Sequence, residues 1–200
     1  AAEAMPQDHR PARDATQLLL RLGRADEALG MAGRWRELAP DESSRTDAEL
    51  ALGVVEYARG NPQRALSLLS AHVSKMLADD REHAMALRTF IEALAATDQM
   101  QRAEDLLMPL AQSDVGWAGF MASTAVAAPP SEANIERAER WLEAVGPMLE
   151  GDRRGASYVA SAWMVLDARS PDSGYARRAV SYAQAAASAG GDSWELQAAK

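Results

Sequence analysis

The strongest constraint on the fold is a short phrase that recurs along the chain. The phrase is a helical apolar pattern, a turn signal and a second helical pattern that contains a small residue. The small residues are Ala28, Ala65, Ala103, Ala138 and Ala179, with spacings of 37, 38, 35 and 41 residues. A period of this length is typical of stacked helical hairpins, because one hairpin cannot bury its apolar face alone. The sequence therefore predicts an all-α chain, and most enzyme folds are excluded.

The clearest copy of the phrase lies between residues 46 and 77. Leu52-Gly53 is followed by a turn signal at Gly60-Asn61-Pro62 and then by Ala65 and Leu69. Gly and Asn tolerate a left-handed backbone, and Pro suits the first turn of a helix. We predict that Thr46 caps a helix that runs to Arg59, and that a second helix returns after the turn.

Similar patterns predict the other helices. Apolar residues at helical spacing indicate helix pairs over residues 10–22 and 25–38, 82–96 and 101–111, and 155–168 and 175–189. A further pair is indicated over residues 117–127 and in a long helix that follows Ser131, with Ile135, Ala138, Trp141, Leu142 and Val145 on its apolar stripe. Gly23 is predicted to end the first helix, and residues 41–44 are predicted to form a loop. Asp98 takes the place of Gly60 in the third turn, and Asp tolerates a left-handed turn. Ser131 is predicted to cap its helix, and Pro147 to kink or end it.

These residues resemble the tetratricopeptide repeat family. Leu52-Gly53, Gly60-Asn61, Ala65 and Leu69 stand where the family pattern has its large-Gly pair, its turn, its small residue and its large residue. The other copies match at Gly23, Ala28 and Pro40, at Ala103 and Leu107, at Ala138 and Leu142, and at Ala179 and Ala183.

The resemblance implies one right-handed α-solenoid domain over residues 1–200. It would contain about five antiparallel helix-turn-helix repeats, at residues 10–41, 45–79, 82–113, 115–150 and 154–189. Residues 192–200 read as the start of a further helix, and the chain begins without Met. We therefore expect it to be a piece of a longer protein.

Composition limits the partners. The formal net charge of −8 argues against binding to nucleic-acid phosphate. No apolar run approaches the roughly 20 residues of a membrane-spanning helix, so direct membrane insertion is not expected. The absence of Cys excludes disulfides and leaves the compartment open, although we favour the cytoplasm over the periplasm. The predominance of Arg over Lys, together with frequent Ala, is typical of a high-GC bacterial genome.

No motif indicates catalysis, a metal site or a cofactor. His9, His72 and His83 form no ligand pair at metal-binding spacing. No glycine-rich phosphate loop or nucleophile elbow is present. The acidic pairs Asp26-Glu27 and Glu104-Asp105 lie near expected helix starts, where they would favour the helix dipole, as would Asp79-Asp80 at a turn. We therefore predict a non-catalytic protein without a cofactor.

Tryptophan and methionine have two readings each. Trp35, Trp117, Trp141 and Trp194 fall at positions expected to pack between repeats, whereas Trp163 could face an inner groove. The methionines could line an adaptable binding surface, but filling gaps in an alanine-rich core is the favoured role.

In proteins of the family that this chain resembles, the first helix of each hairpin lines a concave groove. The resemblance therefore implies a groove that binds a peptide or partner protein. Its candidate residues are Arg13, Gln17, Arg21, Asp47, Leu50, Val54, Tyr57, Met85, Arg88, Glu92, Ala118, Ala122, Val159 and Trp163. Arg13, Arg21 and Arg88 are hypothesised to meet acidic groups or a chain-terminal carboxylate, and the alternative is that they are solvated surface residues.

Three functions stay open at this point. The favoured one is an interaction scaffold or adaptor that binds another protein. The second is a recruiting or regulatory arm of a larger multidomain enzyme or transcription regulator. The third is a structural protein that self-associates through its open C-terminal end, because open solenoid ends can stack.

Overall fold

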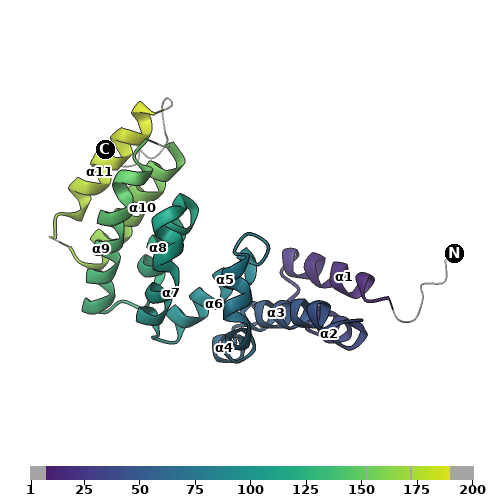
Figure 1. The fold of residues 1–200 in the computed structure, drawn as a ribbon. Helices are drawn as coiled ribbons and strands as arrows, with labels where there is room; N and C mark the ends of the chain where they lie inside the picture. Colours follow the sequence, from purple (N-terminus) through teal and green to yellow (C-terminus); the bar gives the residue numbers. More distant parts are fainter. Residues whose placement is uncertain (1–7, 152, 172, 190–200) are drawn as a thin grey trace. The chain divides into compact units, whose positions relative to one another are not determined.

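The computed structural model describes residues 8–151, 153–171 and 173–189, and these residues form helices joined by turns (Figure 1). The predicted all-α class is confirmed. The chain divides into two compact units, unit 1 over Ala1–Thr97 and unit 2 over Asp98–Lys200. The predicted single solenoid and its repeat count stay predictions. Gly190-Gly191, Trp194 and the expected further helix lie outside the described residues.

Unit 1 is built from successive helices that pack against their neighbours in the chain. They are α1 (Arg10–Arg21), α2 (Ala25–Leu38), α3 (Glu42–Ala58), α4 (Pro62–Leu69), the 3₁₀ turn η1 (Ser70–His72), α5 (Val73–Ala78) and α6 (Ala84–Ala96). Helix α1 packs on α2, α2 on α3 and α3 on α4, and α6 packs against both α3 and α4.

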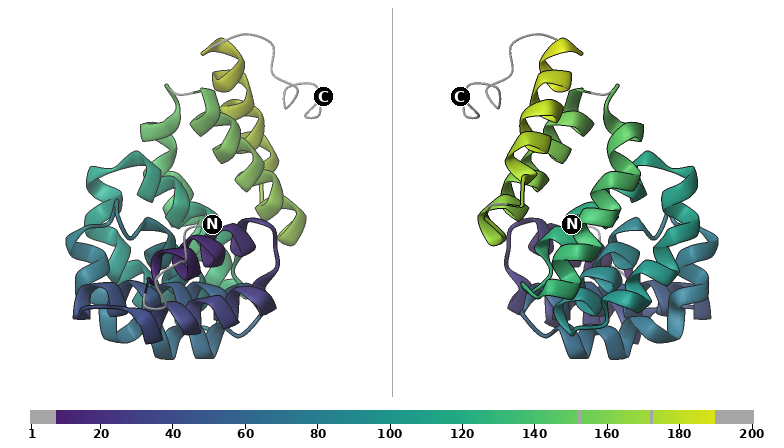
Figure 2. Two further views of the ribbon diagram at one scale, coloured as in Figure 1. Left: turned by 90° about the vertical axis from the view of Figure 1, so that its right-hand side faces the viewer. Right: turned by 90° about the vertical axis from the view of Figure 1, so that its left-hand side faces the viewer.

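Unit 2 contains α7 (Met100–Ser113), α8 (Val115–Ala127), α9 (Glu132–Leu149), α10 (Arg153–Arg169) and α11 (Tyr175–Ser188). Helices α10 and α11 lie side by side along most of their length (Figure 2). Pro147 lies inside α9 and does not end it, because the helix continues to Leu149. Ser131 caps α9 as predicted, because its Oγ accepts the backbone N–H of Asn134 at 3.2 Å.

The turns follow the predicted backbone chemistry. Gly23 and Gly60 have φ angles of +70° and +81°, in the left-handed region that glycine adopts without strain. Asp98 has a φ of +59°, so it takes the left-handed conformation of the glycine that it replaces. Each of these residues directly follows a helix or its last cap, which explains why helix ends were readable from sequence.

Two expectations in the second hairpin are wrong. Asp41, not Thr46, caps α3: its carboxylate accepts the N–H of Ser44 at 2.7 Å, and residues 42–44 are helical instead of forming a loop. A carboxylate at the N-terminus of a helix interacts favourably with the helix dipole. This interaction favours a helix that begins after Asp41 over one that begins after Thr46. The returning helix is also interrupted by η1, where the Ser70 hydroxyl donates to the carbonyl of Leu66 at 2.5 Å.

The recurring small residues are core positions. Ala28, Ala65, Ala103 and Ala138 are fully buried, and Ala179 is 3% exposed. The Leu-Gly pair has a related role, since a Cβ added to Gly53 would lie 2.5 Å from Cγ of the fully buried Leu69. Small residues at these points let successive helices approach closely.

Tryptophans Trp35, Trp117 and Trp141 are buried as predicted. Glu104, which was assigned a helix-dipole role near a helix start, is buried in the structure at 6% exposure. Its carboxylate accepts the indole N–H of Trp141 at 2.6 Å and pairs with Arg137 at 3.0 Å, which ties α7 to α9.

Candidate functional site

The candidate site is a cleft of about 670 Å³ within unit 1. It is formed by α1, α3 and the start of α6, with one residue from α2. Its lining residues are Arg13, Thr16, Gln17, Leu20, Arg21, Trp35, Asp47, Leu50, Ala51, Val54, Ala58, Glu82, His83, Met85 and Ala86. The volume lies in the range of sites that hold a sizeable ligand.

Seven of the fourteen groove candidates meet in this cleft. Arg13, Gln17, Arg21, Asp47, Leu50, Val54 and Met85 all line it. They come from three helices that are separated in sequence, and they meet because α3 packs against both α1 and α6. Sequence reasoning placed these seven residues on one surface, and the structure brings them together.

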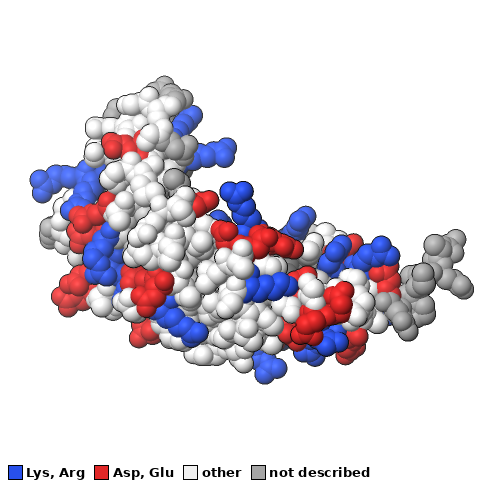
Figure 3. All heavy atoms as spheres, viewed as in Figure 1, with Lys and Arg blue, Asp and Glu red and all other residues white. Residues whose placement is uncertain are grey.

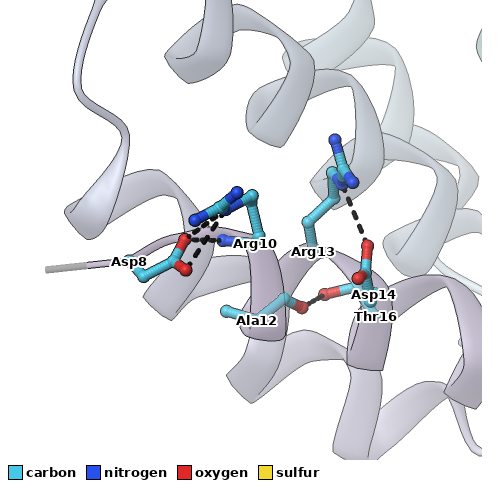
Figure 4. A network of polar contacts seen from close by, with 6 residues as sticks. All are labelled: Asp8, Arg10, Ala12, Arg13, Asp14 and Thr16. Atoms are coloured by element: carbon cyan, nitrogen blue, oxygen red, sulfur yellow. Dashed lines mark hydrogen bonds and ion pairs between the residues drawn. The ribbon is translucent and has the colours of Figure 1, made fainter. Parts of the chain in front are cut away.

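Helix α1 forms a polar wall of the cleft. Arg13, Gln17 and Arg21 are four residues apart, so they lie on one face of the helix. The Nε of Arg13 donates to the Asp14 carboxylate at 3.1 Å, and both side chains are largely exposed (Figure 4). An exposed pair between adjacent residues is weak and leaves the guanidinium able to exchange partners.

Thr16 also lines the cleft, and it makes a side-chain hydrogen bond within α1. It is fully buried, and its hydroxyl donates to the carbonyl of Ala12 at 2.8 Å (Figure 4). The hydroxyl proton of Thr16 is therefore already used within the helix.

Helix α3 forms an apolar wall. Leu50, Val54 and Ala58 are spaced by four residues, and Ala51 lies beside them. Asp47 begins this row, and its carboxylate accepts from Nζ of Lys75 at 2.7 Å. The lysine offsets the acidic charge of Asp47, so the α3 wall is close to neutral where it meets the cleft.

The third side comes from the start of α6. Glu82 is exposed, His83 is 9% exposed, and Met85 is 63% exposed. An exposed Met beside a cleft is a flexible apolar contact that can adapt to different surfaces. Glu82 gives this end an acidic character that contrasts with the two arginines of α1.

Sequence reasoning missed eight of the lining residues. They are Thr16, Leu20, Trp35, Ala51, Ala58, Glu82, His83 and Ala86. Leu20, Ala51 and Ala58 lie three or four positions from predicted members on the same helix, so an extended helical stripe finds them. Trp35 comes from α2, to which the groove pattern assigns no residue, and its burial also places it in the core.

Three further candidates lie on the helices of the cleft without lining it. Tyr57 and Glu92 are half-buried, and Arg88 is exposed. Burial raises the pKa of Glu92, while the charge of Arg88 acts in the opposite direction. Burial also raises the pKa of Tyr57, and the charge of Glu92 adds to this effect. The mutual influence places Tyr57, Glu92 and Arg88 as electrostatic neighbours on α3 and α6.

The candidates in unit 2 require a correction. Ala118, Ala122 and Val159 are fully buried and Trp163 is 1% exposed, so none of them presents a surface to a partner. Trp163 packs against Tyr175, with ring centroids 5.3 Å apart, and the Arg178 guanidinium lies 4.8 Å from its ring. These four residues are core residues, and we remove them from the candidate site.

On unit 2, the face seen in Figure 3 carries an uncharged area over α8 and α10. Met164 and Val165 of α10 are exposed apolar residues of this unit, at 47% and 42% exposure. The cleft of unit 1 is the candidate site, because it brings charged and apolar side chains together around one cavity.

Within the described residues, no group of three or more His, Asp or Glu is placed to hold a metal ion. None of the described helices combines the length and the apolar character of a membrane span. A comparison with family models, curated proteins and solved structures gave no match. The resemblance to tetratricopeptide repeats therefore rests on the residues quoted for it.

Proposed function

We propose that this chain is a tetratricopeptide-like α-solenoid of about five hairpins and that it acts as a non-catalytic interaction module. In this proposal, the cleft of unit 1 binds a segment of another protein. The observation that carries it is the cleft itself, because seven residues chosen from the repeat pattern line one cavity of about 670 Å³.

The chemistry of the lining supports this function. An apolar wall from α3 offers hydrophobic burial, and the charged side chains of α1 can fix the orientation of a bound segment. The burial of the recurring alanines supports the repeat interpretation, since a hairpin repeat needs small residues where helices cross.

The test is a selection of displayed random peptides, about 16 residues long or about four helical turns, against the full chain. Val54→Arg places a charge in the apolar wall, and we expect the selected peptides to lose at least about tenfold in affinity. Leu18→Arg is the matched control, because Leu18 is 57% exposed on α1 and does not line the cleft.

Circular dichroism and thermal melting verify that both variants stay folded. Peptides that bind the wild type and both variants equally well would show that the cleft is not the binding surface. That result would overturn the proposed function.

A further inference from the structure

The two long walls of the cleft differ in chemistry and match in length. Arg13 and Arg21 are eight residues apart on α1, as are Leu50 and Ala58 on α3. At a rise of about 1.5 Å per residue, each row extends for about 12 Å, or about two helical turns. An occupant that runs along the cleft therefore meets a basic row on one side and an apolar row on the other.

The basic row has little acidic compensation from its own helix. Arg13 pairs with Asp14 in an exposed contact, and no ion pair of Arg21 occurs in the described part of the chain. Asp47, on the opposite wall, is paired with Lys75. Charge complementarity therefore favours an occupant whose acidic side chains face α1.

The lining also discriminates between an extended and a helical occupant. An extended segment leaves its backbone N–H and C=O groups in need of partners, whereas a helix satisfies all but its terminal groups internally. The apolar row Leu50, Val54 and Ala58 offers no hydrogen bonds, and the Thr16 hydroxyl already donates to the carbonyl of Ala12. The hydrogen-bonding groups of the described lining lie outside these three residues: Arg13, Gln17, Arg21, Asp47, Glu82, His83 and the indole N–H of Trp35. A backbone that lies along the apolar row therefore needs internal hydrogen bonds, which a helix provides.

We infer that the cleft takes one face of an amphipathic helix from a partner protein. Its apolar stripe lies against α3, and its acidic side chains, about two turns apart, lie against Arg13 and Arg21. The four-residue spacing on both walls matches the ridges that helices present to one another. This inference rests on the proposed function and specifies the conformation and charge of the partner.

The peptide selection described above tests the inference through sequence pattern. We expect the enriched peptides to carry apolar residues with a period of about 3.6 and acidic residues on one flank of that stripe. A Pro placed in the middle of an enriched peptide should lower its affinity at least about tenfold, because Pro breaks the helix. Circular dichroism should show that the peptide gains helix when it binds.

Charge reversal gives an independent readout. The double variant Arg13→Glu with Arg21→Glu should weaken acidic peptides about tenfold or more, and higher salt should reduce the difference between it and the wild type. The matched control is Arg34→Glu with Arg36→Glu, which makes the same charge change on exposed positions of α2 that do not line the cleft. A selection repeated on the cleft double variant should enrich basic flanks in place of acidic ones.

The outcomes separate the two proposals. Peptides that need Val54 but tolerate Pro, or that show no acidic preference, would overturn the helical partner and leave the proposed function standing. Peptides that bind independently of Val54, or no enrichment at all, would overturn both.

Discussion

At the scale of single residues, Gly53 is a point of close approach between α3 and α4. A Cβ at this position would lie 2.5 Å and 2.6 Å from two side-chain carbons of Leu69, which is fully buried. Gly53→Ala gains helix propensity of about 1 kcal/mol, but overpacking of this kind costs about 1–3 kcal/mol. We expect the cost of overpacking to exceed the gain in helix propensity, so that the free energy of unfolding falls by about 1 kcal/mol.

Chemical denaturation measures this loss, and α2 supplies the control. Gly30 is an exposed helical glycine with nothing within 4 Å of an added Cβ. Gly30→Ala should therefore stabilise the protein by about 0.5–1 kcal/mol. If both variants shift stability in the same direction, the close approach at Gly53 is not what the residue provides.

Glu104 makes a second prediction at this scale. Its two oxygens contact Trp141 and Arg137, and the side chains of Glu104 and Arg137 are 8% and 16% exposed. Glu104→Ala leaves the indole N–H of Trp141 without its acceptor, and the largely buried guanidinium of Arg137 loses its carboxylate while it still donates to Asn134. We expect a loss of about 3 kcal/mol. Glu104→Gln keeps an oxygen for Trp141 and should lose only about 1–2 kcal/mol. Urea titration compares the variants, and equal losses would show that the hydrogen bond to Trp141 contributes little.

At the scale of helices, two residues are candidates for the N-cap of α3, and the structure places only one of them at the helix start. Asp41 accepts the N–H of Ser44, whereas Thr46 lies inside the helix. We expect Asp41→Ala to lower the melting temperature by a few degrees and Thr46→Ala to change it less. A larger effect of Thr46→Ala would move the helix start back to the position that the sequence suggested.

The same cap has a defined pH dependence. The hydrogen bonds from Ser44 hold the pKa of Asp41 below its ordinary value of 3.8. A lowered pKa means that the cap stabilises the folded state above about pH 3.8 and that this contribution is lost as the pH falls through the folded-state pKa. The difference in melting temperature between wild type and Asp41→Ala should therefore shrink in acid.

The limits of sequence reasoning also appear at this scale. Helix ends were predictable from sequence where a glycine permits the left-handed backbone that ends a helix, as at Gly23 and Gly60. The start of α3 was not, because Asp41 and Thr46 are both good caps and only the three-dimensional context decides between them.

The candidate site divides in the same way. The candidates in α1 and α3 were assigned from the repeat pattern, and in both helices polar and apolar side chains recur with helical period, so the candidates share one face. Helix α8 contains no charged residue, so its pattern does not distinguish an inner from an outer face. Ala118 and Ala122 were assigned to the groove on repeat position alone, and both are buried.

At the scale of the whole molecule, a repeat architecture makes a prediction that a single globular core does not. In a solenoid each repeat contacts only its neighbours, so a local destabilisation should stay local. Unit 2 contains a glycine that serves as the corresponding test position. A Cβ at Gly146 of α9 would collide with the hydroxyl of Tyr182 on α11. Gly53→Ala and Gly146→Ala therefore each introduce a close contact into a different unit, with a fully buried Leu69 in unit 1 and with the end of the half-buried Tyr182 side chain in unit 2.

Native-state hydrogen exchange followed by mass spectrometry locates the response to each change. We expect Gly53→Ala to lower protection of the amides in α3 and α4 and to leave α9–α11 close to wild type, and Gly146→Ala to do the reverse. Gly30→Ala should lower protection in neither unit, because its added Cβ meets nothing. If each overpacked variant lowers protection equally throughout the chain, the two units unfold as one cooperative core, and the description of this protein as a stack of semi-independent hairpins is wrong.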